Sequence, residues 1–216
     1  MDAVMPNPAL PRLRVAVMAM GLLMLLGCTA PPPEPAPKVL TADEAAARTV
    51  VPLTRPIALD KAGQVVDLEF ELPPAEAGLA PQLLIGVRVA GDEEAADKAL
   101  WLLNGYDLMA KVRLSRADGA DAAPLSLTRY DAVSRKRVPL DANGLVPQAI
   151  AISPASGPLQ AAGLISPALH YGSLGLAFLP EAKSGHYRLS IELPEDRPEL
   201  KNMDVELLVG YMGSSK

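Results

Sequence analysis

Strict alternation of apolar and polar residues is the feature that most limits what this chain can fold into. In residues 64–72, QVVDLEFEL, apolar side chains alternate with three acids, and the same period of two recurs at 83–89, 111–115, 187–193 and 205–211. A period of two puts successive side chains on opposite faces of a strand. Because one face is apolar and the other polar, we predict antiparallel strands with one solvated face. The sequence therefore predicts a mostly β fold, an immunoglobulin-like antiparallel β-sandwich.

Two segments are predicted to connect these strands in specific ways. Residues 111–130 contain a strand, the turn sequence ADGADAAP and a second run LSLTRYD, which predicts a β-hairpin with its tip near Asp118 and Gly119. The run 92–106 follows the second predicted strand, begins with three acids, carries apolar residues at helical spacing and ends with an Asn-Gly stop. It predicts one short helix of three turns across an end of the sandwich, with Trp101 packed beneath it.

Two further stretches are less regular. In TADEAAAR, residues 41–48, Thr41 and Glu44 have the spacing of a capping box, so this stretch is either a short helix or an extension of the linker before it. Residues 138–174 are rich in proline, glycine and serine, and their apolar residues follow no clean period. Within them, 148–152 is the best candidate for a short strand between long loops.

The N-terminal segment has the parts of a secretory signal. Two arginines precede an uncharged run of twelve residues, 15–26, and Gly27 and Cys28 follow it. Twelve helical residues rise about 18 Å, which is short of the ~30 Å hydrocarbon core of a bilayer. The segment is therefore predicted to be a signal that is removed. Cys28 is the only cysteine in the chain, so it cannot form an intrachain disulfide.

The sequence LLGC at 25–28 resembles the lipobox of bacterial lipoproteins. The resemblance implies that Cys28 is lipidated and becomes the first mature residue, and Thr29 after it favours the outer membrane. The alternative is an ordinary secretory signal with a structural cysteine nearby. We expect three parts: a lipoprotein signal peptide at 1–27, a lipidated cysteine with a Pro/Ala-rich linker at 28–54, and a β-sandwich domain at 55–216. The domain is then expected on the periplasmic face of the outer membrane, attached through its lipid anchor.

Charge and histidine content exclude several function classes. The chain has a net charge of −5 and no basic cluster, which excludes nucleic acid as a partner. Its only two histidines are His170 and His186, so a three-histidine zinc site is impossible. Residues 171–175 lack the first glycine of a nucleophile elbow, and 141–144 fits an Asn-Gly turn better than a calcium loop. We expect no catalytic residues, no metal and no cofactor, and hence no enzyme.

The C-terminal third carries the most specific sequence. Residues 184–211, SGHYRLSIELPEDRPELKNMDVELLVGY, resemble a proteobacterial lipoprotein family of unknown function, as do QVVDLEFELP and the helix after the second strand. The resemblance spans about residues 55–212 and implies a single β-sandwich without known catalytic residues. Lipid-anchored sandwiches of this kind often antagonise secreted antibacterial toxins, including phospholipases. The link to this chain is an analogy of architecture and location. It implies an immunity protein with a protein partner; the alternative is a structural or assembly lipoprotein of an envelope machine.

The residues expected to bind that partner lie in the apolar loop 151–171. Loops on a rigid frame usually carry recognition. The apolar side chains of this loop are Leu159, Leu164, Ile165, Leu169 and Tyr171. They either fold back on the sandwich as a satellite core, or some of them, with Leu164 and Ile165 foremost, form an exposed patch anchored by Tyr171. His170 either belongs to this patch or is an ordinary surface residue.

Overall fold

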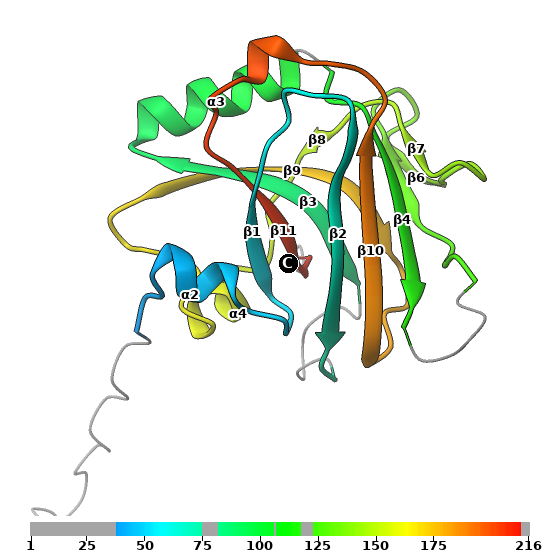
Figure 1. Ribbon diagram of the computed structural model, residues 1–216, viewed down its shortest axis with the longest axis horizontal. Coiled ribbons are helices and arrows are strands. Elements are labelled where there is room, and N and C mark those ends of the chain that lie inside the picture. Colours follow the sequence, from blue (N-terminus) through cyan, green and yellow to red (C-terminus); the bar gives the residue numbers. More distant parts are fainter. Residues whose placement is uncertain (1–37, 75–81, 106, 118–122, 213–216) are drawn as a thin grey trace, which may run out of the picture. The chain divides into compact units, whose positions relative to one another are not determined.

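The computed structural model describes residues 38–74, 82–105, 107–117 and 123–212. In it, two antiparallel sheets pack face to face as a β-sandwich with few helices (Figure 1). This arrangement confirms the mostly β, antiparallel sandwich predicted from the alternation, and the helix after the second predicted strand is present. Among the described residues, no helix is long and apolar enough to cross a membrane.

Within the described ranges, the larger sheet has seven strands and the smaller sheet has four. The larger sheet runs in the order β1 (Leu53–Ile57), β11 (Val205–Tyr211), β3 (Leu83–Gly91), β9 (His170–Leu179), β5 (Thr128–Asp131) and β6 (Lys136–Pro139), with β8 (Ile150–Ala151) also paired to β9. The smaller sheet runs β2 (Gly63–Leu72), β10 (Gly185–Leu193), β4 (Ala110–Arg116) and β7 (Leu145–Val146). The helices are α2 (Ala42–Ala46), α3 (Glu93–Gly105), α4 (Ser156–Ala161) and the 3-10 helix η1 (Pro198–Leu200).

Strands β2 and β10 have the alternation that the sequence predicts. Leu68 is the register partner of Leu189, and the rings of Phe70 and Tyr187 stack with their centroids 5.7 Å apart. The side chain of Asp67, on the other face, is exposed. The inward rows of both strands join the main core between the sheets. Each fully buried apolar side chain there contributes roughly 1.5–3 kcal/mol to the stability of the fold.

Strands β3 and β11 correct the prediction of one solvated face. Ile85 and Val209 face the main core, yet Leu84 and Leu208 on the opposite face are also 0% exposed. A second core covers that opposite face, and its buried members are Ala45, Leu84, Leu159, Leu164, Phe178 and Leu208. The reason lies in the outward positions, which are mostly leucine, glycine and alanine, while the two charged residues there, Arg88 and Glu206, bond to each other. Such a face needs a cover, and α2 and α4 supply it.

The predicted hairpin at 111–130 is wrong in its second half. Strand β4 belongs to the smaller sheet, and its buried Val112 and Leu114 confirm the predicted inward row. Strand β5, however, pairs with β6 and β9 in the larger sheet. The backbone N–H of Leu125 donates to the carbonyl of Leu114 at 2.8 Å, so the chain returns beside β4 only briefly before it crosses between the sheets. The predicted tip at 118–119 lies outside the described residues.

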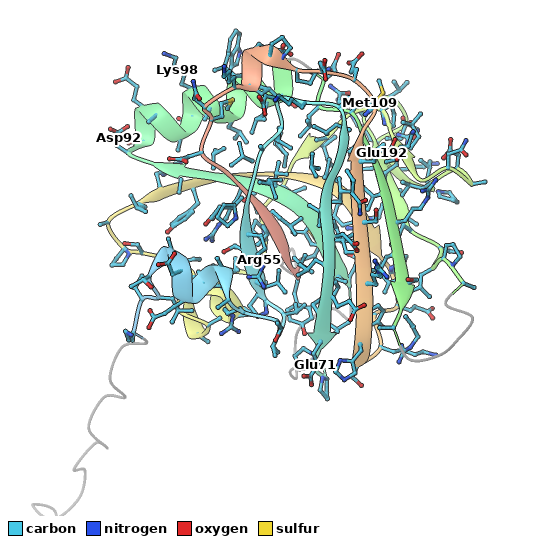
Figure 2. All side chains as sticks on the ribbon, viewed as in Figure 1. Arg55, Glu71, Asp92, Lys98, Met109 and Glu192 are labelled. Carbon is cyan, nitrogen blue, oxygen red and sulfur yellow. The ribbon has the colours of Figure 1, made fainter. Side chains whose placement is uncertain are left out.

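Helix α3 is the predicted helix, and it lies across one end of the sandwich (Figure 1). A carboxylate oxygen of Asp92 accepts a hydrogen bond from the backbone N–H of Ala95 at 2.8 Å, which caps the first turn. Ala96 and Leu103 are buried on its inner side. Figure 2 labels Asp92 beside the start of this helix and Lys98 further along it.

The position predicted for Trp101 beneath this helix is wrong. Its side chain is 70% exposed. The residue that meets the sheet is Leu100, which lies against Gly172 of β9; a Cβ at Gly172 would be only 3.1 Å from its Cδ2. Because successive helical residues are turned by about 100°, Trp101 points away from that contact. The glycine thus lets the helix approach closely with leucine inward and tryptophan outward.

The stretch TADEAAAR contains a short helix, α2, and is not an extension of the linker. The N–H of Glu44 donates to the Thr41 hydroxyl at 3.2 Å, and the N–H of Thr41 donates to the Glu44 carboxylate at 2.8 Å. These two bonds form the expected capping box. At the other end, Arg55 of β1 donates to the carbonyl of Ala45 at 3.1 Å. The stretch 38–54, assigned to the linker from the sequence, therefore packs with the sandwich.

The irregular segment 138–174 contains β7, β8, α4 and the start of β9. Strand β8 falls within 148–152, where a strand was predicted, and pairs with β9. Helix α4 was not predicted, because its sequence SGPLQA contains glycine and proline, which are poor helix formers. The chain leaves α4 through Gly163, whose φ of +71° and approach to the carbonyl of Lys38 both require a residue without Cβ. Its carbonyl accepts from the N–H of Leu40 at 2.9 Å.

Candidate binding site

Of the four residues predicted to bind a partner, Leu164 and Ile165 lie in the loop after α4, and His170 and Tyr171 begin β9. Leu164 is 3% exposed and belongs to the second core, and Ile165 packs half-buried against the same core. The satellite-core alternative therefore holds for these two side chains. Leu164 is no part of a surface patch, because its side chain does not reach solvent. Tyr171 is half-buried and His170 is exposed.

The buried side chain of Arg88 holds this loop from beneath. Arg88 lies on the outer face of β3 and is 5% exposed. Its Nε donates to the carboxylate of Glu206, its register partner on β11, at 2.6 Å, and its Nη1 donates to the backbone carbonyl of Leu164 at 2.8 Å. Its guanidinium also stacks over the ring of Tyr171, with Cζ 4.8 Å from the ring centroid. A buried arginine needs such partners, since an unpaired buried charge is costly.

Tyr171 continues the same network into the turn above it. Its hydroxyl oxygen accepts a hydrogen bond from the backbone N–H of Ser166 at 3.0 Å. The carbonyl of Ser166 accepts from the N–H of Leu169 at 3.2 Å, and its hydroxyl accepts from the N–H of Ala168 at 3.3 Å. Residues 164–171, which we name the braced loop, are therefore fixed at Leu164, at Ser166 and at Tyr171.

The tip of the braced loop is presented to solvent. Residues 167–170 are all exposed, and the apolar side chain of Leu169 is 45% exposed. The Nε2 of His170 lies 3.8 Å from a carboxylate oxygen of Asp97 on α3. The tip thus lies beside α3, with one leucine and one histidine on its surface.

A cleft adjoins the braced loop on the outer face of the larger sheet. Its volume is about 230 Å³. Polar atoms of Arg88, Ser156 and Ser173 and apolar side chains of Ile152 and Leu159 are among its lining. Ser173 is buried, with 7% of its surface exposed. The cleft can therefore receive a short side chain with both polar and apolar atoms.

The other motifs singled out in the sequence have ordinary structural roles. Ser173 is the serine of the incomplete nucleophile elbow at 171–175. It is three residues from His170 on β9, so the two side chains project from opposite faces of the strand. A carboxylate oxygen of Asp141 accepts from the N–H groups of Asn143 and Leu145, at 3.0 and 2.9 Å, which forms the Asn-Gly turn. In the part of the chain that the structure describes, no three His, Cys, Asp or Glu residues gather as a metal site.

Arg88 is the site residue that sequence reasoning missed. The run 83–91 contains this one charge among otherwise uncharged residues. The alternation assigned it to a solvated face, where an arginine needs no explanation. The usable signal was that a strand with leucine, glycine and alanine at its other outward positions has no solvated face, and arginine is almost never fully buried unless it is paired. Cys28, the predicted lipid attachment residue, lies outside the described residues.

The fold and the loop together define a small antiparallel β-sandwich that presents a braced loop and an adjoining cleft on the covered face of its larger sheet. Comparison with protein-family models, with curated proteins and with solved structures finds no match to this chain.

Proposed function

We propose that this protein is an outer-membrane lipoprotein whose β-sandwich, on the periplasmic side, binds a protein partner. The anchor in this proposal is a lipid on Cys28, supported by the apolar run of twelve residues and the LLGC sequence at 25–28. An acidic chain with a single cysteine is compatible with the periplasm, since its domain needs no disulfide to fold. The proposal assigns the protein no catalytic reaction, no cofactor and no metal.

The observation that carries the binding role is the braced loop. Its exposed tip rests on a network that joins Arg88, Leu164, Ser166 and Tyr171 through hydrogen bonds and a stacked ring. A loop that is already fixed before binding loses little conformational entropy on binding. Leu169 and His170 are therefore the residues that we expect to meet the partner, with Tyr171 as a support from below. The cleft beside the loop would receive a side chain of the partner.

Within this class, immunity against a toxin that acts in the periplasm, such as a secreted phospholipase, is the leading role. This role is supported by an analogy: the expected location and the sandwich architecture resemble those of toxin-immunity lipoproteins. A structural or assembly lipoprotein of an envelope machine is the alternative. One observation favours it: the exposed indole of Trp101 on α3 offers a second contact surface, and tryptophan is enriched at protein interfaces. A scaffold that joins two proteins would use both surfaces.

Protection of cells tests the immunity role. A strain that lacks the gene would be challenged with secreted periplasmic phospholipases and peptidoglycan hydrolases, chosen first from those encoded beside the gene. The parent gene should restore survival, and Leu169→Asp should not, although its melting temperature is unchanged. Val133→Asp is the matched control, because Val133 is 94% exposed on the turn between β5 and β6. It should protect as well as the parent.

Two results would contradict the proposal. If the parent gene protects against none of these effectors, the immunity role is wrong and the assembly role takes its place. If the parent protects but both Leu169→Asp and His170→Ala still protect fully, binding occurs elsewhere than on the braced loop.

A further inference from the structure

Strand β2 forms a long edge of the smaller sheet. It has ten residues and pairs along its length with β10 only. The other edges that the structure describes are less open: β7 has two residues, β6 has four, and β1 contains Pro56, which has no N–H to donate. An open edge presents unpaired backbone groups that can accept another strand.

The hydrogen bonds at one end of β2 identify which of its backbone groups face outward. The N–H of Glu71 donates to the carbonyl of Thr49 at 2.7 Å, and its carbonyl accepts from the N–H of Val51 at 3.0 Å. Backbone direction alternates along a strand, so the N–H and C=O groups of Glu69 and Asp67 point to the same edge. Residues 49–51 cover only the Glu71 end, which Figure 2 labels at the tip of β2.

The far side of β10 gives an independent check of this direction. There the carbonyl of His186 accepts from the N–H of Ala117, at 2.9 Å. His186 is the register partner of Glu71, and the backbone groups of both residues therefore point away from the β2–β10 ladder. Arg188 and Ser190, the partners of Glu69 and Asp67, follow the same rule. Among the described residues, four backbone groups of Asp67 and Glu69 lack a strand partner.

The side chains along this edge form an acidic outer row and an apolar inner row. Asp67, Glu69 and Glu71 are exposed on the outer face. Arg188 bonds the two carboxylate oxygens of Asp67 at 2.9 and 2.8 Å and holds the pKa of that carboxyl below its usual value, so Asp67 is charged at neutral pH. Leu68, between them, is half-buried on the inner face.

We propose that the free edge of β2 binds an extended, basic segment of a partner protein as an added strand. Residues directly opposite each other in a ladder share a face. The partner residues opposite Asp67 and Glu69 would therefore be lysine or arginine, and the residue between them would be apolar and lie against Leu68. A second copy of this chain does not fit, because the two acidic rows would face each other. The edge of β2 is a different surface from the braced loop, and strand addition there requires neither the lipid anchor nor a toxin.

Amide exchange in the presence of a defined peptide tests the proposal. The full-length chain, in a non-ionic detergent, would be mixed with the acetylated and amidated peptide TKVKVKT. Exchange of the Asp67 and Glu69 amide protons should slow by about tenfold or more, because a strand bond must open before exchange. The amides of Asp43 and Glu199, outside the strands, should exchange as before. Absence of slowing would overturn the proposal and leave the carboxylates as protection against unwanted pairing.

Two control peptides separate strand addition from simple charge attraction. The peptide TEVEVET should bind at least about fivefold more weakly, since carboxylates would then face carboxylates across the ladder. The basic peptide methylated on the backbone nitrogens of its lysines keeps its charge but cannot donate to the carbonyls of Asp67 and Glu69. It should therefore leave amide exchange at these two residues unchanged. Equal binding of the methylated and unmethylated basic peptides would overturn the proposal.

A charge-reversed edge provides the reciprocal test. The double variant Asp67→Lys, Glu69→Lys should lose TKVKVKT and bind TEVEVET instead. The double variant Glu93→Lys, Glu94→Lys changes the net charge equally but on exposed positions of α3, so it should bind TKVKVKT like the parent. If both double variants lose the basic peptide alike, net charge and not the edge is responsible, and the proposal is wrong.

Discussion

Arg88 is a single side chain that joins two strands and a loop. Its partners are the Glu206 carboxylate, the Leu164 carbonyl and the Tyr171 ring. In Arg88→Met the stem remains but the carbonyl loses its donor and the ring loses its cation. Because a hydrogen bond from a charged group contributes about 1.5–3 kcal/mol, we expect the free energy of unfolding to fall by about 2–3 kcal/mol in urea melts.

Arg113→Met is the control for this change. Arg113 is exposed on the outer row of β4, and its loss should change the free energy of unfolding by less than about 0.5 kcal/mol. Amide exchange should also become faster in the braced loop of Arg88→Met alone. Equal stability of the two variants would mean that Arg88 does not brace the loop.

Adjacent residues of β10 test the register of the main core. Leu189 is 0% exposed between the sheets, and Ser190 faces the outer side beside Asp67 and Arg113. Leu189→Ala should cost about 2–5 kcal/mol of the free energy of unfolding, because a cavity remains where the side chain was. Ser190→Ala should cost less than about 0.5 kcal/mol. Urea melts of the two variants decide it; similar losses would contradict the assigned faces.

The capping of helix α2 depends on the carboxylate of Glu44, and the pKa of this group predicts how the capping changes with pH. A hydrogen bond from the Lys38 side chain, followed by those from Thr41, lowers the pKa of Glu44 from 4.5 to about 2. A lowered pKa in the folded state stabilises the fold above the unfolded value and loses this effect as the pH falls from about 4.5 towards 2. The difference in melting temperature between the parent and Glu44→Gln should therefore narrow between pH 6 and pH 3.

Asp43→Asn is the matched control for the titration. It removes one charge from the same turn of α2 but leaves the capping box intact. Its melting temperature should keep the pH dependence of the parent, because Glu44 and its hydrogen bonds are unchanged. A gap between the parent and Glu44→Gln that stays constant with pH would mean that the negative charge of Glu44 does not stabilise the fold.

The elements that sequence predicted well are those whose two faces differ in polarity. In β2 and β10 the outward positions carry charges, so the period of two fixes both the strand and its buried row. In β3 and β11 the outward leucines are covered by helices that come from distant parts of the chain, and a local pattern contains no information about such a cover. The alternation is the same in all four strands, but tertiary packing determines whether the second face is exposed to solvent.

The candidate site could be located from sequence but not assembled. An apolar loop without a period pointed to 151–171. There the structure joins Leu164 and Tyr171 through Arg88, and Ile165 packs against the second core. The missing information was a contact between residues 76 positions apart, Arg88 and Leu164, which no local pattern encodes. The prediction for Trp101 was wrong for a related reason, since Gly172 on β9 determines which side of α3 faces the sheet.

In the lipoprotein proposal, attachment of the whole chain to the membrane depends on Cys28. Cys28 is the only thiol and follows the twelve-residue apolar run, so Cys28→Ser should give a chain without lipid, either uncleaved or soluble in the periplasm. Metabolic labelling with a palmitate analogue measures this. Thr29→Asp is the control: it keeps the cysteine and should be labelled like the parent, but move towards the inner-membrane fraction. Acyl chains supply about 0.8 kcal/mol per buried CH₂, so a cleaved chain without lipid should leave the membrane, whereas an uncleaved chain should stay at the inner membrane. Equal labelling of Cys28→Ser and the parent would end the lipoprotein proposal.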